Sequence, residues 1–356
     1  MKQLRVLVVD DSAYNRRTLT DLLSAIPNVE VVGKASDGDE ALRLVSELQP
    51  DLITLDLEMP RMDGFTFLRL LMARRPTPVI VVSGYSAKEN VFRALELGAI
   101  DFIAKPSRTV TSDLSGIQED LANMVHMVRQ LAPPGLDPGR RISPRTGQEF
   151  GVSTRDTQPP RNEAPEPKSI VVIGSSTGGP TALVEVFRRL PPNANAAVLV
   201  AQHMPERFTK TFAERLDRLG GMRVREASSS HRLEAGVAYV CPGGRCLEVA
   251  GDARGGFVAN VVKPETDDRY VPSVDRLFLT AAASVGSKLV SVVLTGMGDD
   301  GAKGVVAVKN AGGFVIAESP ETAVIYGMPG SAVRTGSVDQ SLPLRALAER
   351  LAELVS

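Results

Sequence analysis

The chain has 356 residues, which is enough for two domains of ordinary size, each with a core of its own. Its 41 lysines and arginines are matched by 42 aspartates and glutamates, and the net charge of -1 disfavours a role in bulk nucleic-acid binding. The two cysteines lack metal-ligand or redox spacing, no signal-peptide cleavage site follows the N-terminus, and no apolar run approaches the roughly 20 residues that cross a bilayer. We therefore expect a soluble, cytoplasmic protein without membrane insertion.

Residues 1–131 predict an α/β domain. Five short apolar runs are separated by segments with helical periodicity, a pattern typical of a parallel sheet with helices on both faces. We expect a five-stranded sheet in the order 2-1-3-4-5. The predicted strands are residues 4–9, 29–35, 52–55, 79–82 and 100–104.

Polar side chains follow four of these five strands. Asp10 and Asp11 follow the first strand and Asp56 the third, and in the expected order these strand ends are neighbours at the topological switch point. Carboxylates held together repel one another unless a cation joins them, and Mg²⁺ suits an all-oxygen site. Ser83 ends the fourth strand and Lys105 follows the fifth, which adds a hydroxyl and an ammonium that could hold a phosphoryl group. An Asp-Asp pair alone is more often a turn or a helix cap, but the joint placement predicts a site.

These segments together resemble the response-regulator receiver domain, which has a flavodoxin-like fold, from residue 3 to about residue 130. The resemblance implies that Asp56 accepts a phosphoryl group from a histidine kinase as an acyl phosphate. It also implies that Asp10, Asp11, Asp56 and the backbone carbonyl of Glu58 hold Mg²⁺. The matching segments are residues 8–12, 55–60, 62–64, 82–84 and 102–106.

The same resemblance implies a phosphate-sensing role for Ser83, Lys105 and Phe102. Phe102 stands where the family keeps a rotating aromatic side chain, and plain core packing is the alternative.

Residues 132–168 contain eight of the 24 prolines and almost no apolar periodicity, a composition that predicts a semi-extended linker between two domains.

A short apolar run, residues 170–173, ends in the sequence Gly174-x-Ser176-x-Gly178. This spacing matches the nucleophile elbow, in which glycines allow a sharp turn from strand to helix beneath an exposed serine. A phosphate cradle and a plain turn are the alternatives, although the Walker and Gly-x-Gly-x-x-Gly spacings are both missing. Pro180 suits the first turn of the helix that follows, so the serine would lie at a helix N-terminus.

A nucleophilic serine needs a base and an orienting acid. Of the three histidines, His203 directly follows a predicted strand, residues 197–201, whereas His126 is expected on a helix surface and His231 in a polar loop. After the buried-strand run 289–294, Asp299 and Asp300 are equal candidates for the acid. Glycines on both sides of this pair suggest close backbone approach to a ligand, as an oxyanion hole requires. The chain order Ser, His, Asp is not that of the α/β-hydrolases, so a different parallel sheet is expected.

The second half closely resembles the CheB-type chemotaxis protein-glutamate methylesterases. The resemblance implies a doubly wound, mostly parallel α/β catalytic domain over residues 169–356, with Ser176 as nucleophile, His203 as general base and acid, and Asp300 as orienting acid. Thr177 and Met297 are candidates for contacts near the oxyanion. The matching segments are residues 173–179, 201–205, 207–209, 213–216, 239–243, 272–275 and 295–301.

Two positions depart from the family pattern: Ser175 replaces an alanine, and Asp299 replaces the more usual asparagine. The resemblance implies hydrolysis of glutamate γ-methyl esters on chemoreceptors, with release of methanol, and deamidation of certain receptor glutamines, without a cofactor for the ester chemistry. The partners it implies are a histidine kinase of the chemotaxis type and methylated chemoreceptors. The two-domain architecture predicts that the receiver covers the catalytic residues until Asp56 is phosphorylated.

A non-enzymatic response regulator whose second domain binds a partner or DNA is the alternative. It requires a basic recognition helix, and the arginines of the second half are instead interleaved with acids such as Glu214, Asp217 and Glu226.

Overall fold

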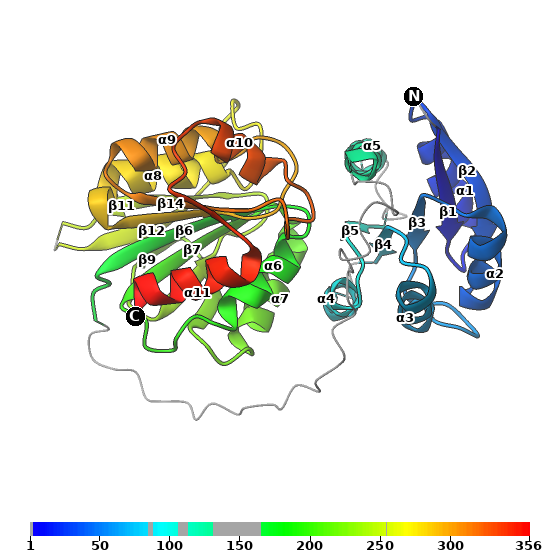
Figure 1. The fold of residues 1–356 in the computed structure, drawn as a ribbon, viewed down its shortest axis with the longest axis horizontal. Helices are drawn as coiled ribbons and strands as arrows, with labels where there is room; N and C mark the ends of the chain where they lie inside the picture. Colours follow the sequence, from blue (N-terminus) through cyan, green and yellow to red (C-terminus); the bar gives the residue numbers. More distant parts are fainter. Residues whose placement is uncertain (1–2, 85–87, 106–112, 131–164, 254) are drawn as a thin grey trace. The chain divides into compact units, whose positions relative to one another are not determined.

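The computed structural model describes residues 3–84, 88–105, 113–130, 165–253 and 255–356. The chain divides into two compact units, Met1–Gln148 and Glu149–Ser356 (Figure 1). Residues 132–164 of the predicted linker lie outside the described residues. Among the helices within those ranges, none combines the length and the apolar character needed to cross a membrane.

The first unit contains the predicted five-stranded parallel sheet in the order β2-β1-β3-β4-β5. Helix α1 packs against α5, and α2 packs against α3. Val9 of β1 lies opposite Leu55 of β3, so the residues that follow these two strands emerge side by side. The elements are β1 (Leu4–Val9), α1 (Ala13–Ser24), β2 (Val29–Ala35), α2 (Gly38–Leu48), β3 (Leu52–Leu55), α3 (Gly64–Arg74), β4 (Val79–Ser83), α4 (Lys88–Glu96), β5 (Asp101–Ala104) and α5 (Asp113–Gln130).

The second unit is built on a seven-stranded parallel sheet in the order β15-β14-β13-β6-β7-β10-β8. The strands β7 and β13 are buried along their length, and β6 is buried from its second residue on, as expected for a parallel sheet covered on both faces. The strands of this sheet are β6 (Ser169–Ser175), β7 (Ala196–Gln202), β8 (Arg223–Glu226), β10 (Val237–Val240), β13 (Leu289–Val293), β14 (Phe314–Glu318) and β15 (Gln340–Leu342).

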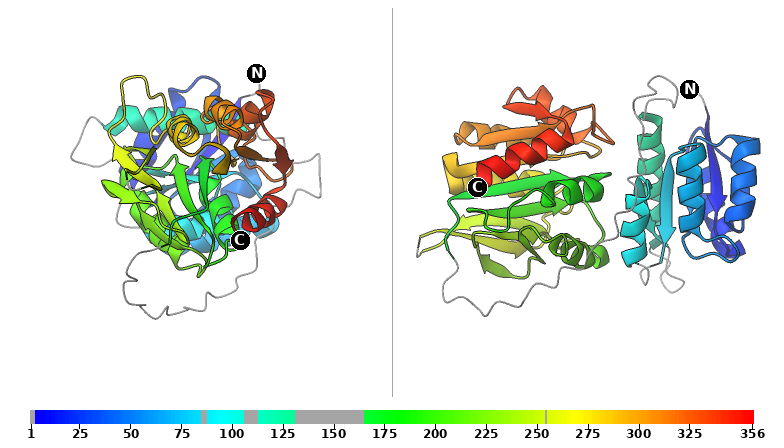
Figure 2. Two further views of the ribbon diagram at one scale, coloured as in Figure 1. Left: turned by 90° about the vertical axis from the view of Figure 1, so that its left-hand side faces the viewer. Right: turned by 60° about the horizontal axis from the view of Figure 1, so that its bottom comes forward.

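Helices cover both faces of this sheet, which makes the unit doubly wound. Helices α6, α7 and α11 lie on one face and α8, α9 and α10 on the other (Figures 1 and 2). From β6 the chain first builds outward through β7 and then returns to the other side of β6 with β13, so a topological switch point lies beside β6. The helices are α6 (Gly179–Phe187), α7 (Glu206–Asp217), α8 (Val274–Val285), α9 (Ala302–Asn310), α10 (Met328–Arg334) and α11 (Leu344–Val355).

A three-stranded antiparallel sheet, in the order β11-β12-β9, was not predicted. It consists of β9 (Ser230–Arg232), β11 (Cys246–Gly251) and β12 (Phe257–Val262), and β11 packs against α8. His231 therefore lies in a strand, and its expected position in a loop is wrong. Among the described strands β9 pairs with β12 alone, at the edge of this sheet, and its polar sequence lacks the apolar run that predicted the other strands.

Candidate active site and acidic pocket

Ser176 and His203 emerge side by side from the carboxyl edge of the seven-stranded sheet. In the pairing of β6 with β7, Ser175 lies opposite Gln202, and each of the two candidate residues comes next in its strand. The N–H of His203 donates to the carbonyl of Ser175 at 3.0 Å. The register of two adjacent parallel strands therefore brings the predicted nucleophile and base together.

The side chain of Gln202 links these two strand ends. Its Nε2 donates to the carbonyl of Ser176 at 3.0 Å and to that of His203 at 2.9 Å. Its Oε1 accepts from the hydroxyl of Ser175 at 2.7 Å. Ser175 and Gln202 are both buried, so the serine that departs from the family pattern completes a buried polar network. Sequence reasoning missed Gln202, although an amide that ends a fully apolar strand is a signal in itself.

Glycines allow the turn that carries Ser176. Gly178 has φ +77° immediately before α6, a conformation that favours glycine. The N–H of Ser176 donates to the carbonyl of Thr295 at 3.0 Å, which joins the turn to the loop after β13. A Cβ placed at Gly296 would lie 2.8 Å from the Cβ of Ser176, so this close approach requires glycine.

The predicted oxyanion contacts lie on these same two loops. Within the described residues, the backbone N–H groups of Thr177 and Met297 have no hydrogen-bond acceptor. Thr177 follows the serine directly, and Met297 follows Gly296, which touches Ser176. Two N–H groups without acceptors beside a serine are the donors that an oxyanion hole needs.

Asp300 is the acid that contacts the histidine. Its Oδ2 lies 2.8 Å from Nε2 of His203, and the side chain is buried. The N–H groups of Val274 and Asp275, at the start of α8, donate to its two oxygens at 2.8 Å each. A helix N-terminus and two backbone donors stabilise the ionised carboxylate.

Asp299 has different surroundings. Its side chain is exposed, and its Oδ1 accepts from Nη1 of Arg269 at 3.2 Å and from the hydroxyl of Tyr270 at 3.0 Å. The two neighbouring acids, which the sequence left equal, are thus separated by burial and by their partners. Because Nε2 of His203 contacts Asp300, Nδ1 is the ring nitrogen left to face the serine. No hydrogen bond joins the Ser176 hydroxyl to that ring in the described part of the chain.

A buried carboxyl group, which sequence reasoning missed, supports the loop beneath Ser176. Glu318 at the end of β14 accepts from the N–H of Thr295 at 2.8 Å and from the hydroxyl of Thr322 at 2.9 Å. Burial raises the pKa of Glu318 to about 7, against the effect of these two hydrogen bonds. The hydroxyl of Thr295 donates to the carbonyl of Thr177 at 2.9 Å, which extends the support to the residue after the nucleophile.

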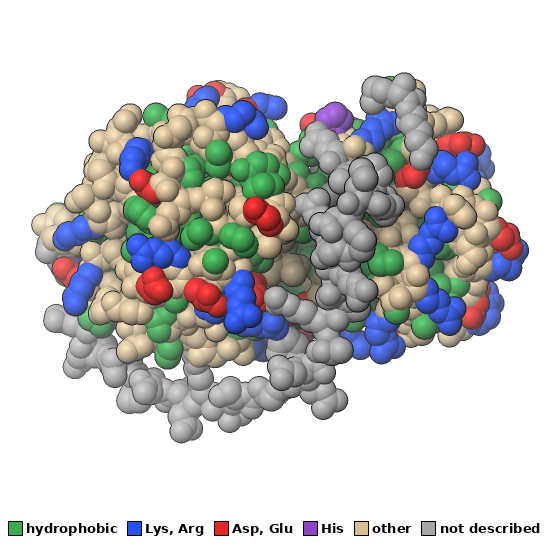
Figure 3. Space-filling model, viewed as in Figure 1, with side chains coloured by type: hydrophobic (Ala, Val, Ile, Leu, Met, Phe, Trp, Pro, Cys, Tyr) green, Lys and Arg blue, Asp and Glu red, His purple; other side chains and the backbone are tan. Residues whose placement is uncertain are grey.

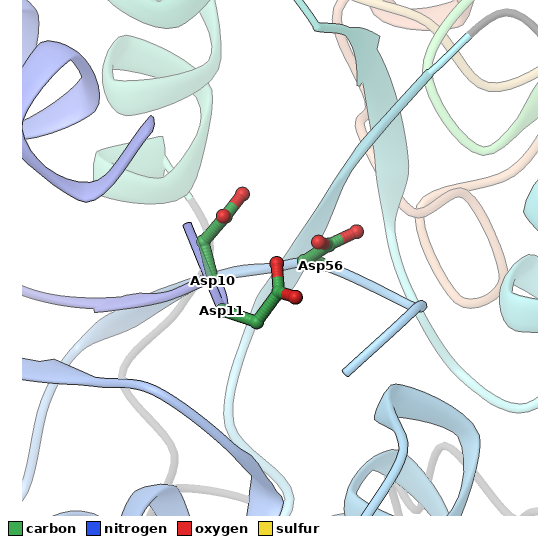
Figure 4. A group of neighbouring side chains, drawn as sticks. All are labelled: Asp10, Asp11 and Asp56. Atoms are coloured by element: carbon green, nitrogen blue, oxygen red, sulfur yellow. The ribbon is translucent and has the colours of Figure 1, made fainter. Parts of the chain in front are cut away.

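In the first unit, Asp10, Asp11 and Asp56 form an acidic pocket (Figure 4). Each offers a carboxylate oxygen, and these oxygens lie within 4.8 Å of one another. The cap of α1 is Ser12, whose hydroxyl accepts from the N–H of Asn15, so neither Asp10 nor Asp11 caps this helix through its side chain. Asp11 is exposed while Asp10 and Asp56 are buried, which suits a hydrated cation held at one open side.

Lys105 contacts this pocket as predicted. Its Nζ lies 2.6 Å from Oδ2 of Asp56 and 2.9 Å from Oδ2 of Asp10. Burial opposes the charge of Lys105, but the contacts with Asp56 and Asp10 outweigh it and raise the pKa of the lysine. The N–H of Lys105 also donates to the carbonyl of Ser83 at 2.8 Å, which places this buried serine at the same edge of the sheet.

The remaining predicted residues of the first unit are Glu58 after β3, Phe102 within β5 and His126 on α5. The carbonyl of Glu58 accepts no hydrogen bond from the described residues, which leaves it available as a ligand. Phe102 is buried and packs edge to face against Phe92 of α4, with ring centroids 6.3 Å apart. Its contacts here are those of a core residue, and rotation of the ring stays a prediction. His126 is exposed on α5, as expected.

The first unit has the sheet order and acidic pocket of a response regulator, and the second has a hydrolase-like serine, histidine and aspartate. The model for the response regulator receiver domain matches residues 6–112. The model for the CheB methylesterase matches residues 171–351. The chain belongs to the CheB methylesterase family, in the form that carries a receiver domain.

Similar proteins match the chain over nearly its whole length. A protein-glutamate methylesterase/protein-glutamine glutaminase of Geobacter sulfurreducens is 46% identical over 362 residues, which covers 99% of this chain and 97% of that protein. One of Myxococcus xanthus is 46% identical over 352 residues, with the same coverage of 99% and 97%. The crystal structure of the CheB methylesterase catalytic domain of Thermotoga maritima is 42% identical, with a TM-score of 0.51, and covers 52% of this chain and 98% of that one.

Proposed function

We propose that this chain hydrolyses glutamate γ-methyl esters on chemoreceptors, and that phosphorylation of Asp56 activates it. It also deamidates specific receptor glutamines. The observation that carries the proposal is the meeting of Ser176, His203 and Asp300 at the carboxyl edge of one parallel sheet, with His203 Nε2 2.8 Å from Asp300. Membership of a family whose relatives carry both activities in their names supports it.

In the first half-reaction, Oγ of Ser176 attacks the ester carbonyl carbon while Nδ1 of His203 takes its proton. Asp300 stays ionised, holds the ring with its proton on Nε2 and stabilises the imidazolium that forms. The oxyanion of the tetrahedral intermediate accepts from the N–H groups of Thr177 and Met297. The intermediate collapses to an acyl-serine, and His203 returns its proton to the leaving methoxide, which departs as methanol.

In the second half-reaction, water attacks the acyl-serine while His203 takes its proton. The ring then returns this proton to Oγ of Ser176, and the receptor glutamate is released as a free carboxylate. With a glutamine substrate the steps are the same, except that the leaving group takes the proton as ammonia. Neither half-reaction requires a cofactor.

We also assign the acidic pocket to phosphorylation. Asp10, Asp11, Asp56 and the carbonyl of Glu58 would hold Mg²⁺, and their clustered oxygens fit this ion. When bound, Mg²⁺ supplies positive charge that offsets the phosphoryl oxygens. Asp56 takes the phosphoryl group from a histidine kinase of the chemotaxis type.

Phosphate sensing belongs to the residues around Asp56. Lys105 and Ser83 contact the phosphoryl oxygens, and Phe102 responds through its packing against α4.

The receiver comprises residues 1–131 and the catalytic domain residues 169–356, and residues 132–168 tether the two. Two free buried thiols, Cys241 and Cys246, are consistent with a cytoplasmic location.

The DNA-binding alternative finds no support in the described residues. Arg223 and Arg225, two of the arginines that could form a basic patch, both pair with Glu234, at 3.4 and 2.8 Å. On the face of the second unit visible in Figure 3, basic and acidic side chains are interspersed. A DNA titration at several salt concentrations checks this, because binding to phosphates weakens as salt rises.

The function is tested by methanol release from methylated receptor fragments. The wild-type chain should release methanol, and Ser176→Ala should not. Ser175→Ala is the matched control, since it removes the adjacent hydroxyl and should retain most of the activity. Undiminished methanol release by Ser176→Ala would end the esterase proposal.

A further inference from the structure

One face of the His203 imidazole is covered by an aromatic ring that no prediction assigned. The ring of Tyr270 lies nearly parallel to it, with centroids 5.3 Å apart and an interplanar angle of 10°. Tyr270 comes from the loop between β12 and α8, far from His203 in the chain. Asp300 thus contacts the edge of the imidazole through a hydrogen bond to Nε2, and Tyr270 contacts one face through stacking.

Three neighbours keep Tyr270 in this position. Its hydroxyl donates to Oδ1 of Asp299 at 3.0 Å, and Nη1 of Arg269 reaches the same oxygen at 3.2 Å. The guanidinium of Arg269 also lies over the tyrosine ring, 5.1 Å from its centroid. A Cβ at Gly298 would lie 2.6 Å from the tyrosine hydroxyl, so a glycine at this position leaves room for the contact. Burial and Asp299 raise the pKa of Tyr270, so the phenol stays a donor at neutral pH.

The stacked ring has a consequence for the charged form of the base. His203 becomes an imidazolium each time it takes a proton, and a cation over the face of an aromatic ring is attracted by the ring's electrons. The charged groups around the imidazole are Asp300, in direct contact, and Asp299 and Arg269, which reach it through Tyr270. Asp299 and Arg269 form an exposed ion pair, and solvent largely screens the effect of their charges on the imidazolium. The tyrosine ring is therefore the neighbour that acts on the face of the imidazole.

We propose that Tyr270 is a positioning residue for His203: it fixes the angle of the imidazole and stabilises the imidazolium, while Asp299 and Arg269 hold the tyrosine. The role in catalysis rests on the proposed esterase function. The stacking on His203 can be tested without it.

The test compares Tyr270→Leu, which removes the ring, with Tyr270→Phe, which keeps the ring and removes only the hydroxyl. The first measurement is an NMR titration of the His203 ring in the full chain, which has only three histidines, with His203→Gln to assign the signal. Loss of the ring destabilises the imidazolium, so in Tyr270→Leu the titration midpoint should move to lower pH by about half a unit or more. In Tyr270→Phe it should stay within about 0.2 unit of wild type, because Arg269 still lies over the ring and holds it after the bond to Asp299 is lost.

The second measurement is methyl-ester hydrolysis as a function of pH. Tyr270→Leu should lower kcat by about 3- to 30-fold with little change in KM, and should move the acid limb of kcat/KM to lower pH. Tyr270→Phe should keep the wild-type limb. A loss of activity in Tyr270→Leu without any shift of the limb or the NMR midpoint would assign the tyrosine a structural role only and overturn the proposal, as would wild-type behaviour of both variants.

Two further arms keep the outcome decisive. If Tyr270→Leu does not fold, Tyr270→Met replaces it, because its flexible, unbranched side chain can pack into part of the same space without a π face. The NMR readout needs no substrate. A wild-type chain that releases no methanol would therefore refute the proposed function, while the midpoint shift would still decide whether Tyr270 supports His203.

Discussion

Asp300 and Asp299 are chemically identical neighbours, yet only Asp300 has the contacts of an orienting acid. Asp300 accepts three N–H groups, from His203, Val274 and Asp275, whereas the exposed Asp299 accepts from the exposed Arg269 and the half-buried Tyr270. The difference arises from α8, whose first turn lies over one carboxylate and not the other. No local pattern encodes that packing, and for this reason the residues alone could not separate the pair.

Replacing Asp300 with asparagine should lower kcat for methyl-ester hydrolysis by about 10³- to 10⁴-fold. The carboxamide cannot accept from all three N–H groups, and it no longer balances the imidazolium charge. Asp299→Asn is the matched control and should lower kcat by less than about tenfold, because its oxygen can still accept from Tyr270. Methanol release at saturating substrate measures both, and equal losses would contradict the assignment.

Glu318 should make stability depend on pH. Burial raises its pKa in the folded chain to about 7, above the ordinary value of 4.5, so between these values the folded chain keeps a proton that the unfolded chain releases. This contribution to stability is present below about pH 4.5 and is lost as the pH rises through about 7, by about 3 kcal/mol in all.

Glu318→Gln isolates the effect, because a glutamine can still accept from Thr295 and has no proton to lose. Urea unfolding at pH 5 and pH 8 should show that the free energy of unfolding of the wild-type chain falls more than that of Glu318→Gln over this range. A parallel change in the two proteins would show that Glu318 is not the group responsible.

At the scale of elements, apolar periodicity predicted the parallel sheets well. The first three predicted strands coincide with β1, β2 and β3, and the other two differ from β4 and β5 by one residue at one end. Strands buried on both faces are continuous apolar runs that a sequence displays directly. The antiparallel sheet has half-buried strands that depend on one another for pairing, so β9, β11 and β12 lack such a signal.

Gly174 controls how closely β6 and α8 approach. A Cβ at this position would lie 2.2 Å from Cγ1 of the buried Val274, whose N–H donates to Asp300. Gly174→Ala should therefore lower the free energy of unfolding by about 1–3 kcal/mol and reduce kcat through displacement of Asp300.

Gly251→Ala is the matched control for this strand glycine, because a Cβ there meets no atom within 4 Å. It should change the free energy of unfolding by less than about 0.5 kcal/mol. Urea unfolding and methanol release together check the pair. A Gly174→Ala chain as stable and as active as Gly251→Ala would contradict the packing argument.

At the scale of the whole molecule, we expect phosphorylation in the first unit to need a divalent cation and ester hydrolysis in the second unit to need none. Within the described residues, the acidic cluster suited to a cation is Asp10, Asp11 and Asp56, and it belongs to the first unit. Removing divalent cations with EDTA should abolish stimulation by a small-molecule phosphodonor and leave the basal rate of methanol release unchanged. Loss of the basal rate as well would place a metal in the ester chemistry.

Phosphorylation must shift the populations of an inactive and an active state. Moving the ratio of active to inactive molecules from 1:99 to 99:1 takes about 5.5 kcal/mol, and it would raise the rate by up to about 100-fold. The sequence motifs predict both ends of this switch, Asp56 and Ser176. They do not predict the contacts that hold the catalytic residues, such as Gln202 and Tyr270, because those contacts form between segments distant in the chain.

Cleavage of the ester by Ser176 under the control of Asp56 is tested most directly by the rate of methanol release from a methylated chemoreceptor. The rate is measured with and without phosphodonor for wild type, Ser176→Ala and Asp56→Asn. The wild-type rate should rise with phosphodonor, Asp56→Asn should stay at the basal rate, and Ser176→Ala should release none in either condition. Methanol release by Ser176→Ala at the wild-type rate, or equal stimulation of Asp56→Asn, would contradict the account.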